Sequence, residues 1–174
     1  MTSIQIPIYQ HIDQIKELNS KYLITNLTEA EKQSGFIRIE YDKDSLKKII
    51  DDQEIVVATN HDKIIGYYLI GRKSGFAALD YQKNKAISLF DTKNIPFDKI
   101  GFGCQVCIDK AHRNNGLFKS MLDTLCNAIK EKYSHLLCSV SDDNIVSLKT
   151  HTKNGWQSFD TIDKTHFFIY PTNN

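Results

Sequence analysis

The chain has 174 residues, and its 22 Lys plus Arg against 21 Asp plus Glu give a net charge of +1. This length corresponds to a single domain with a core large enough to need no disulfide or metal. Apolar residues make up 41% of the chain and charged residues 25%, which excludes a disordered or fibrous protein. Because the charge is balanced, we expect neither nucleic acid nor an anionic membrane surface as a partner.

Neither a membrane span nor a signal peptide is expected. No window reaches about 20 apolar residues, and Met1–Gln10 lacks a basic region followed by an apolar one. Cys104, Cys107, Cys126 and Cys138 are expected to be free thiols in a reducing compartment, which predicts a cytoplasmic protein. The spacing of Cys104 and Cys107 suggests zinc, but a second pair is missing and an odd spacing puts them on opposite faces of a strand. No metal is therefore expected.

The first half of the chain predicts strands and helices in alternation. Residues 4–8 alternate in polarity and contain Pro7, which is typical of an edge strand. Helical spacing follows over residues 12–18. Thr28–Glu31 has the sequence of a capping box and starts a short helix that Gly35 ends.

A second helix is predicted over residues 44–50, and residues 55–59 and 64–70 read as the two strands of a hairpin. Residues 71–99 have no clear periodicity and suit a variable loop or a short helix. No linker or repeat divides the chain, so residues 1–174 are expected to form one domain.

The second half shows stronger periodicity. The predicted elements are a strand over 102–108, a helix over 117–129, a strand over 136–140, a helix over 145–153, and strands over 156–161 and 166–170. This order implies a crossover and at least one parallel strand pair, hence a mixed α/β fold.

The segment Arg113–Phe118 lies where a strand ends, a polar turn follows and a long helix begins. Free backbone N–H groups and the helix dipole make such a helix start suitable for a phosphate or pyrophosphate. A nucleoside-triphosphate loop is excluded because no Gly-Lys-Ser/Thr follows, and a dinucleotide fingerprint is excluded because one glycine of three is present.

Two segments carry a family resemblance. Arg113–Phe118 resembles the Arg/Gln-x-x-Gly-x-Gly/Ala loop that wraps the pyrophosphate of acetyl-CoA in the GCN5-related N-acetyltransferases (GNAT). Asn144 is followed by Ser147 at three, His151 at seven and Gly155-Trp156 at eleven and twelve, which looks like a second signature of that family. The sequence departs from the pattern at Phe118, where the family has a small residue, and at His151, where it usually has tyrosine.

The resemblance implies a GNAT-like fold whose twisted central sheet splays between strands 102–108 and 136–140. It assigns the acceptor side to about residues 1–99 and the acetyl-CoA side to about residues 100–174. The cofactor-binding residues that it implies are Cys107, Ile108, Arg113, Asn114, Asn115, Gly116, Leu117, Phe118 and Asn144. His151 is expected to assist the departing thiolate, either as a minor imidazolium that gives a proton or as a neutral N–H donor to sulfur, and Phe118 is expected to turn inward.

The expected reaction moves an acetyl group to a primary amine of a small molecule or a peptide. Candidates for the base are Glu40, in the early segment that the resemblance assigns to the acceptor side, and then Glu54 and Asp80. Gln105, on the predicted cofactor strand, cannot act as a base and is expected to position a water or the amine. The alternative is a catalytically silent protein that keeps the fold and binds CoA. A homodimer is compatible with the resemblance.

Overall fold

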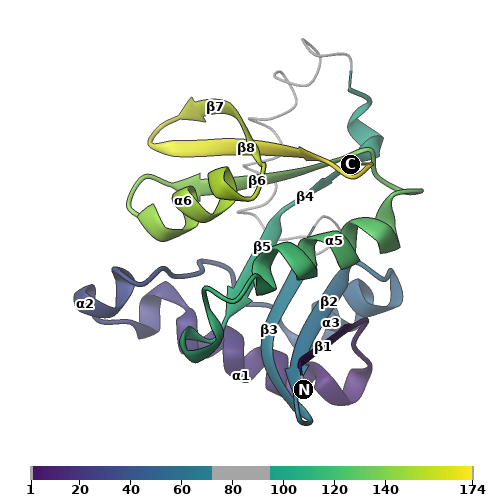
Figure 1. The fold of residues 1–174 in the computed structure, drawn as a ribbon, viewed down its shortest axis with the longest axis vertical. Coiled ribbons are helices and arrows are strands. Elements are labelled where there is room, and N and C mark those ends of the chain that lie inside the picture. Colours follow the sequence, from purple (N-terminus) through teal and green to yellow (C-terminus); the bar gives the residue numbers. More distant parts are fainter. Residues whose placement is uncertain (1, 72–94, 174) are drawn as a thin grey trace.

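Two four-stranded sheets organise the chain in the computed structural model, which describes residues 2–71 and 95–173 (Figure 1). In the first sheet, neighbouring strands are antiparallel and follow the order β1 (Thr2–Gln5), β2 (Ile55–Asn60), β3 (Lys63–Ile70), β5 (Cys104–Ile108). In the second, the order is β4 (Ile100–Phe102), β6 (His135–Ser141), β8 (Thr165–Pro171), β7 (Gln157–Ile162). The mixed α/β fold predicted from the sequence is confirmed, and so is the parallel pair, which β4 and β6 form.

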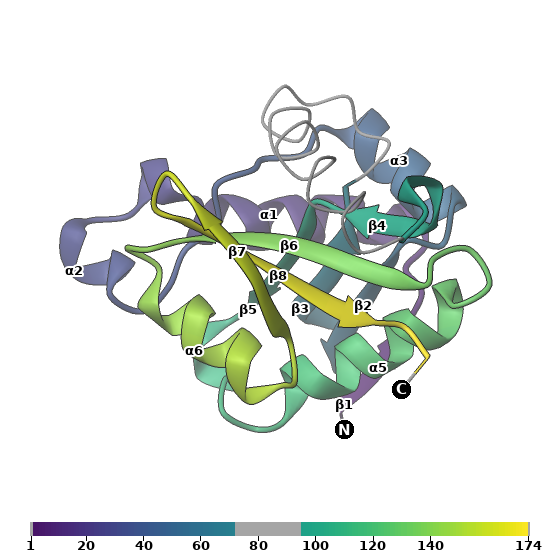
Figure 2. The ribbon, with the colours of Figure 1, turned by 90° about the horizontal axis from the view of Figure 1, so that it is seen from above.

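Helices cover both faces of the first sheet. The helices are α1 (Ile12–Tyr22), α2 (Glu29–Lys32), α3 (Lys43–Asp51), α5 (Leu117–Ile129) and α6 (Ile145–Lys153). Short 3₁₀ turns occur at Tyr9–His11, Ile24–Asn26, Phe97–Lys99 and Lys110–His112. Helices α1 and α3 lie against one face of the first sheet, and α5 lies against the other. Helix α6 lies beside the second sheet (Figures 1 and 2).

Strand β2 shows why the first sheet is buried on both sides. Successive side chains of a strand point to opposite faces. Val56 and Ala58 pack in the cluster that contains the apolar face of α5, whereas Ile55 and Val57 pack with α1 and α3. A continuous apolar run, rather than an alternating one, is the sequence pattern that such a strand requires.

Local signals in the first half are confirmed, with one shift in position. The edge strand predicted over residues 4–8 forms at Thr2–Gln5, and the chain leaves the sheet before Pro7, which has no N–H to donate to a neighbouring strand. The capping box forms at α2: the Thr28 hydroxyl accepts a hydrogen bond from the Glu31 N–H at 3.3 Å, and the Glu31 carboxylate accepts one from the Thr28 N–H at 2.8 Å. The hairpin of β2 and β3 also forms.

The predicted strand over residues 102–108 is wrong as a single strand. Gly103 has a φ of 75°, a left-handed conformation that glycine adopts without strain, and it turns the chain from one sheet into the other. Before it, β4 pairs with β6, with Phe102 beside Leu137. After it, β5 pairs with β3 in the first sheet. Strands β5 and β6 therefore diverge beyond Gly103, and this is the splay that the resemblance in the sequence implied.

Most of the predicted loop over 71–99, including Asp80, lies outside the described residues. Within residues 2–71 and 95–173, each helix is too short or too polar to cross a bilayer.

Candidate functional site

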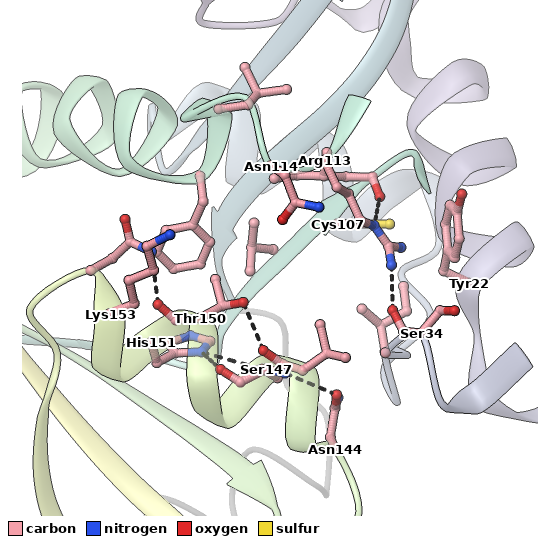
Figure 3. A pocket seen from close by; sticks show the side chains of 18 of the residues that line it. Tyr22, Ser34, Cys107, Arg113, Asn114, Asn144, Ser147, Thr150, His151 and Lys153 are labelled. Carbon is pink, nitrogen blue, oxygen red and sulfur yellow. Dashed lines mark hydrogen bonds between the residues drawn. The ribbon is translucent and has the colours of Figure 1, made fainter. Parts of the chain in front are cut away.

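Two pockets open where β5 and β6 separate. The first pocket, about 290 Å³, lies between the Arg113–Lys119 segment and α6, with Tyr22 and Ser34–Ile37 on its third side (Figure 3). The second pocket, about 320 Å³, lies between residues 36–39, β5 and β6.

The two pockets meet at a junction. The residues that line both are Phe36, Ile37, Val106, Asn144, Ser147 and His151. The apolar members come from the segment after α2 and from β5, whereas the polar members come from α6 and its N-cap. Molecules that enter from the two sides would therefore meet beside a polar helix face.

Strand β5 offers a free backbone edge to this junction. The Asp109 N–H donates to the Ile65 carbonyl of β3, and the Gly103 carbonyl accepts from the Gly71 N–H directly after β3; the strand pairing between these two bonds is regular. Because antiparallel strands bond through every second residue, Cys107 also faces β3, and Val106 and Ile108 face the splay. Cys107 lines the first pocket, but its backbone N–H is directed away from it. The backbone groups of β5 that face the splay are therefore those of Val106 and the N–H of Ile108, because Arg113 Nε already donates to the Ile108 carbonyl.

The loop before α5 has the geometry of an anion site. Gly116 is the N-cap of α5 and has a φ of 75°, and Asn114 has a φ of 64°. A Cβ on Gly116 would meet no described atom within 4 Å, so the space before the helix start is open. The first N–H groups of a helix lack intrahelical partners and bind anions. Asn114, Gly116 and Leu117 line the first pocket, while Asn115 is exposed and does not.

Arg113 is turned into the protein. Its Nε donates to the Ile108 carbonyl at 2.9 Å, its Nη1 donates to the Ser34 carbonyl, and its guanidinium lies 4.9 Å from the centre of the Tyr22 ring. The residue therefore ties the end of β5 to the segment after α2 and forms part of the pocket wall. Its charge still reaches the pocket, but two of its nitrogens are already used.

The inward orientation expected for Phe118 is confirmed. Its side chain is 7% exposed, and its ring lies 5.5 Å from Tyr68 and 5.3 Å from His151, measured between ring centres. The bulk that replaces the family's small residue thus fills the core beneath the loop. It leaves the space before the α5 N–H groups clear.

His151 is buried in an aromatic cluster. It is 4% exposed and contacts Phe118, Trp156 and Phe168. Burial lowers its pKa from 6.5 to about 4, although a hydrogen bond to the Ser147 backbone opposes this shift. That bond joins Nδ1 to the Ser147 carbonyl at 2.8 Å. A neutral ring protonated at Nδ1 follows, and this argues against an imidazolium acid at neutral pH.

Asn144 holds the junction together. Its side-chain oxygen accepts from the Ser147 N–H at 3.3 Å and caps α6. Its Nδ2 donates to the Phe36 carbonyl at 2.8 Å. One buried side chain thus fixes the acceptor-side segment against the start of α6.

Several pocket residues carried no sequence signal. Ser34–Ile37 has no periodicity, and Tyr22 reads as an ordinary helix residue. Lys153 at the end of α6 also lines the first pocket, and its ammonium has no ion pair with any residue of 2–71 or 95–173. The sequence does not show that Lys153 lies near the loop before α5. This becomes visible only when the structure places α6 opposite that loop (Figure 3).

The candidates for the acceptor side lie in different parts of the structure. Gln105 is buried, lines the second pocket and donates from Nε2 to the Tyr67 hydroxyl at 2.9 Å. Glu40 is exposed and lines neither pocket. Glu54 is fully buried, accepts from the Tyr133 hydroxyl and also lines neither. Of the candidates within the described residues, only Gln105 reaches the splay.

Three of the four cysteines are buried, and Cys104 is half-buried. All four are free thiols, and burial raises the pKa of Cys107 to about 12. Cys104 and Cys107 pack in different clusters on opposite faces of the sheet, as predicted. Among the described residues, no group of His, Cys, Asp and Glu side chains could hold a metal ion.

Comparison with known sequences identifies the fold and its family. The sequence model of the acetyltransferase (GNAT) family matches residues 13–156. This segment contains the loop before α5, the splay and α6. No curated protein sequence is significantly similar to the chain.

Similar solved structures cover nearly the whole chain. yncA of Salmonella typhimurium, solved with its cofactor acetyl-CoA, is 14% identical, with a TM-score of 0.65 over 100% of this chain and 95% of that one. The PaiA N-acetyltransferase of Thermoplasma acidophilum, solved with coenzyme A, is 14% identical, with a TM-score of 0.66 over 98% and 99% of the two chains. An N-acetyltransferase of Staphylococcus aureus Mu50 is 15% identical, with a TM-score of 0.65 over 99% of each chain.

Proposed function

Because this chain belongs to the acetyltransferase (GNAT) family, we propose that it transfers an acetyl group from acetyl-CoA to a primary amine. The proposal rests on one observation, the junction at which the two pockets meet. Acetyl-CoA enters through the first pocket and the acceptor through the second. The acceptor is a small molecule or a peptide that presents an amine.

Acetyl-CoA supplies an acetyl group activated as a thioester, and this chain supplies the groups that hold it. The N–H groups at the start of α5, with the open space at Gly116, bind the pyrophosphate. Lys153 adds a positive charge from the opposite wall. The Val106 N–H and carbonyl and the Ile108 N–H, on the edge of β5 that faces the splay, bind the pantetheine arm, and one of these N–H groups polarises the thioester carbonyl.

The acceptor must reach the carbonyl as a neutral amine. A lysine-like amine of pKa about 10.4 is only roughly 0.04% neutral at pH 7. None of the described residues that line the pockets is a carboxylate. Water therefore takes the proton, and Gln105 positions the amine or that water. Orientation of the amine against the thioester supplies much of the rate.

His151 enters this proposal as a neutral side chain rather than as the imidazolium. Its Nδ1–H is used by the Ser147 carbonyl, and the aromatic cluster fixes its ring. In this form it positions α6 at the junction instead of losing a proton to the thiolate.

The test is release of free thiol from acetyl-CoA in the presence of a panel of primary amines, with acetylated product identified by mass spectrometry. Amine-dependent thiol release is the expected result. Thermal stabilisation by acetyl-CoA without thiol release for any amine would instead support the catalytically silent CoA-binding protein. The observation that favours this alternative is that, within residues 2–71 and 95–173, no carboxylate lines the junction.

A further inference from the structure

We propose that the Ser147 hydroxyl is a catalytic hydrogen-bond donor to the sulfur of CoA as the acetyl group is transferred. The inference rests on the proposed function and names a residue that acts on the leaving group of that reaction. It concerns the side chain that stands three residues after Asn144 on α6.

Ser147 lies where the reaction must occur. It is half-buried and lines both pockets, as do the other two polar side chains of the junction, Asn144 and His151. Both amide atoms of Asn144 are engaged, since Oδ1 caps α6 and Nδ2 donates to the Phe36 carbonyl. His151 is engaged through Nδ1.

The position of the His151 proton decides which way the Ser147 hydroxyl points. A carbonyl oxygen only accepts, so the 2.8 Å contact between Nδ1 and the Ser147 carbonyl requires the proton on Nδ1. Nδ1 then cannot accept from the Ser147 hydroxyl, which lies 3.3 Å away. That hydroxyl oxygen can accept from Nδ1–H, but its own hydrogen has no acceptor within residues 2–71 and 95–173. It is free to point into the junction.

The neighbouring hydroxyls of α6 differ in this respect. Thr150 donates to the Val146 carbonyl at 2.7 Å, and Thr152 donates to the Leu148 carbonyl at 3.0 Å. Both bond to a carbonyl four residues earlier, as hydroxyls inside helices commonly do. Ser147 is thus the hydroxyl of this helix that reaches the junction with a hydrogen to give.

The atom that accepts the hydrogen bond from the Ser147 hydroxyl is inferred from the two walls of the junction. On one wall, the free backbone edge of β5 at Val106 and Ile108 offers N–H groups to the thioester carbonyl. Ser147 stands on the α6 wall, so the thioester atom left for its hydroxyl is the sulfur (Figure 3). In the transfer, the amine nitrogen bonds to the carbonyl carbon, the C–S bond breaks and its electron pair stays on sulfur. The nitrogen gives its extra proton to water, and Ser147 stabilises the thiolate without losing its own proton.

Two readouts test the inference. Removing one hydrogen bond to a charged atom costs about 10- to 100-fold in rate. Ser147→Ala should therefore lower kcat by that factor at an unchanged KM for acetyl-CoA, and Ser147→Thr, which keeps a hydroxyl, should recover most of the loss. Thr152→Val is the matched control because it removes an α6 hydroxyl outside both pockets, and it should leave kcat unchanged.

The second readout needs no turnover. The thiol pKa of bound CoA is measured from thiolate ultraviolet absorbance, as the difference between protein loaded with CoA and protein loaded with desulfo-CoA. Loss of a donor to sulfur should raise this pKa by about one to two units in Ser147→Ala, since one unit corresponds to a tenfold change. Thr152→Val should match the wild type.

The outcomes separate the two proposals. An unchanged thiol pKa in Ser147→Ala, or a kcat within threefold of the wild type, overturns the role of Ser147. If Ser147→Ala raises the thiol pKa of bound CoA but the wild type releases no thiol with any amine, the Ser147 contact is supported and the proposed transferase activity is overturned instead.

Discussion

Burial of His151 should make the stability of the protein fall between pH 6.5 and pH 4. The pKa of the folded ring is about 4, below the ordinary value of 6.5, because the ring is enclosed by Phe118, Trp156 and Phe168. The unfolded chain therefore takes up the proton first as the pH falls. The stabilisation is complete above pH 6.5 and is lost as the pH falls to about 4.

The magnitude follows from the shift. One pKa unit is worth 1.36 kcal/mol, so the free energy of unfolding should lose about 3 kcal/mol over this range through His151 alone. That is a large share of the roughly 5–15 kcal/mol typical of a domain. His151→Phe keeps an aromatic ring in the cluster but removes the titration. It also removes the bond to the Ser147 carbonyl, which should cost about 1 kcal/mol at every pH.

The assay is urea unfolding of the wild type and of His151→Phe at intervals between pH 4.5 and pH 7.5. Carboxylates and other histidines titrate in both proteins, so the difference between the two free energies isolates His151. His151→Phe should be less stable than the wild type at pH 7.5 and should overtake it at about pH 6, where the loss through His151 reaches about 1 kcal/mol. A difference that stays constant within about 0.5 kcal/mol across the range would refute the buried neutral histidine.

Three further predictions concern the first pocket. Phe118→Ala should lower the free energy of unfolding by about 3–5 kcal/mol in urea titrations, because it empties a buried site between Tyr68 and His151. Acetyl-CoA at 100 times its Kd should stabilise the wild type by about 2.7 kcal/mol in thermal unfolding, and Gly116→Val should weaken this, because a β-branched residue strains the left-handed backbone before α5. Lys153→Ala should raise the Kd for CoA about two- to fivefold in calorimetry at low salt, and the effect should shrink at high salt as the charge is screened. An unchanged stability, an unchanged ligand shift or a salt-independent Kd would contradict the respective prediction.

The two departures from the family pattern are neighbours in space. Phe118 belongs to the loop motif before α5 and His151 to α6, yet their ring centres lie 5.3 Å apart. The larger side chain at Phe118 and the smaller, buried ring at His151 together fill one part of the core. We therefore expect their substitutions to be non-additive in a double-mutant cycle.

Local signals were sufficient for most elements and for the position of the loop before α5. The capping box at Thr28, the edge strand before Pro7 and the spans of α5 and α6 depend on neighbours along the chain. So does the start of α5, where Gly116 and the free N–H groups lie within a few residues of each other. Hydrogen bonds and periodicity at short range determine such features, and a sequence displays both.

Tertiary structure decided what each site residue can do. Residues 102–108 form two strands because the two halves join different sheets, and the presence of Gly103 in the sequence does not show which sheets these are. Arg113 reads as a phosphate ligand in sequence, but it donates to the carbonyls of Ile108 and Ser34. His151 reads as an acid, but the aromatic rings from α5, β8 and the turn after α6 remove the water that its charged form needs. Desolvation and hydrogen-bond competition are set by residues distant in the chain, so the chemistry of a side chain becomes defined only when the chain has folded around it.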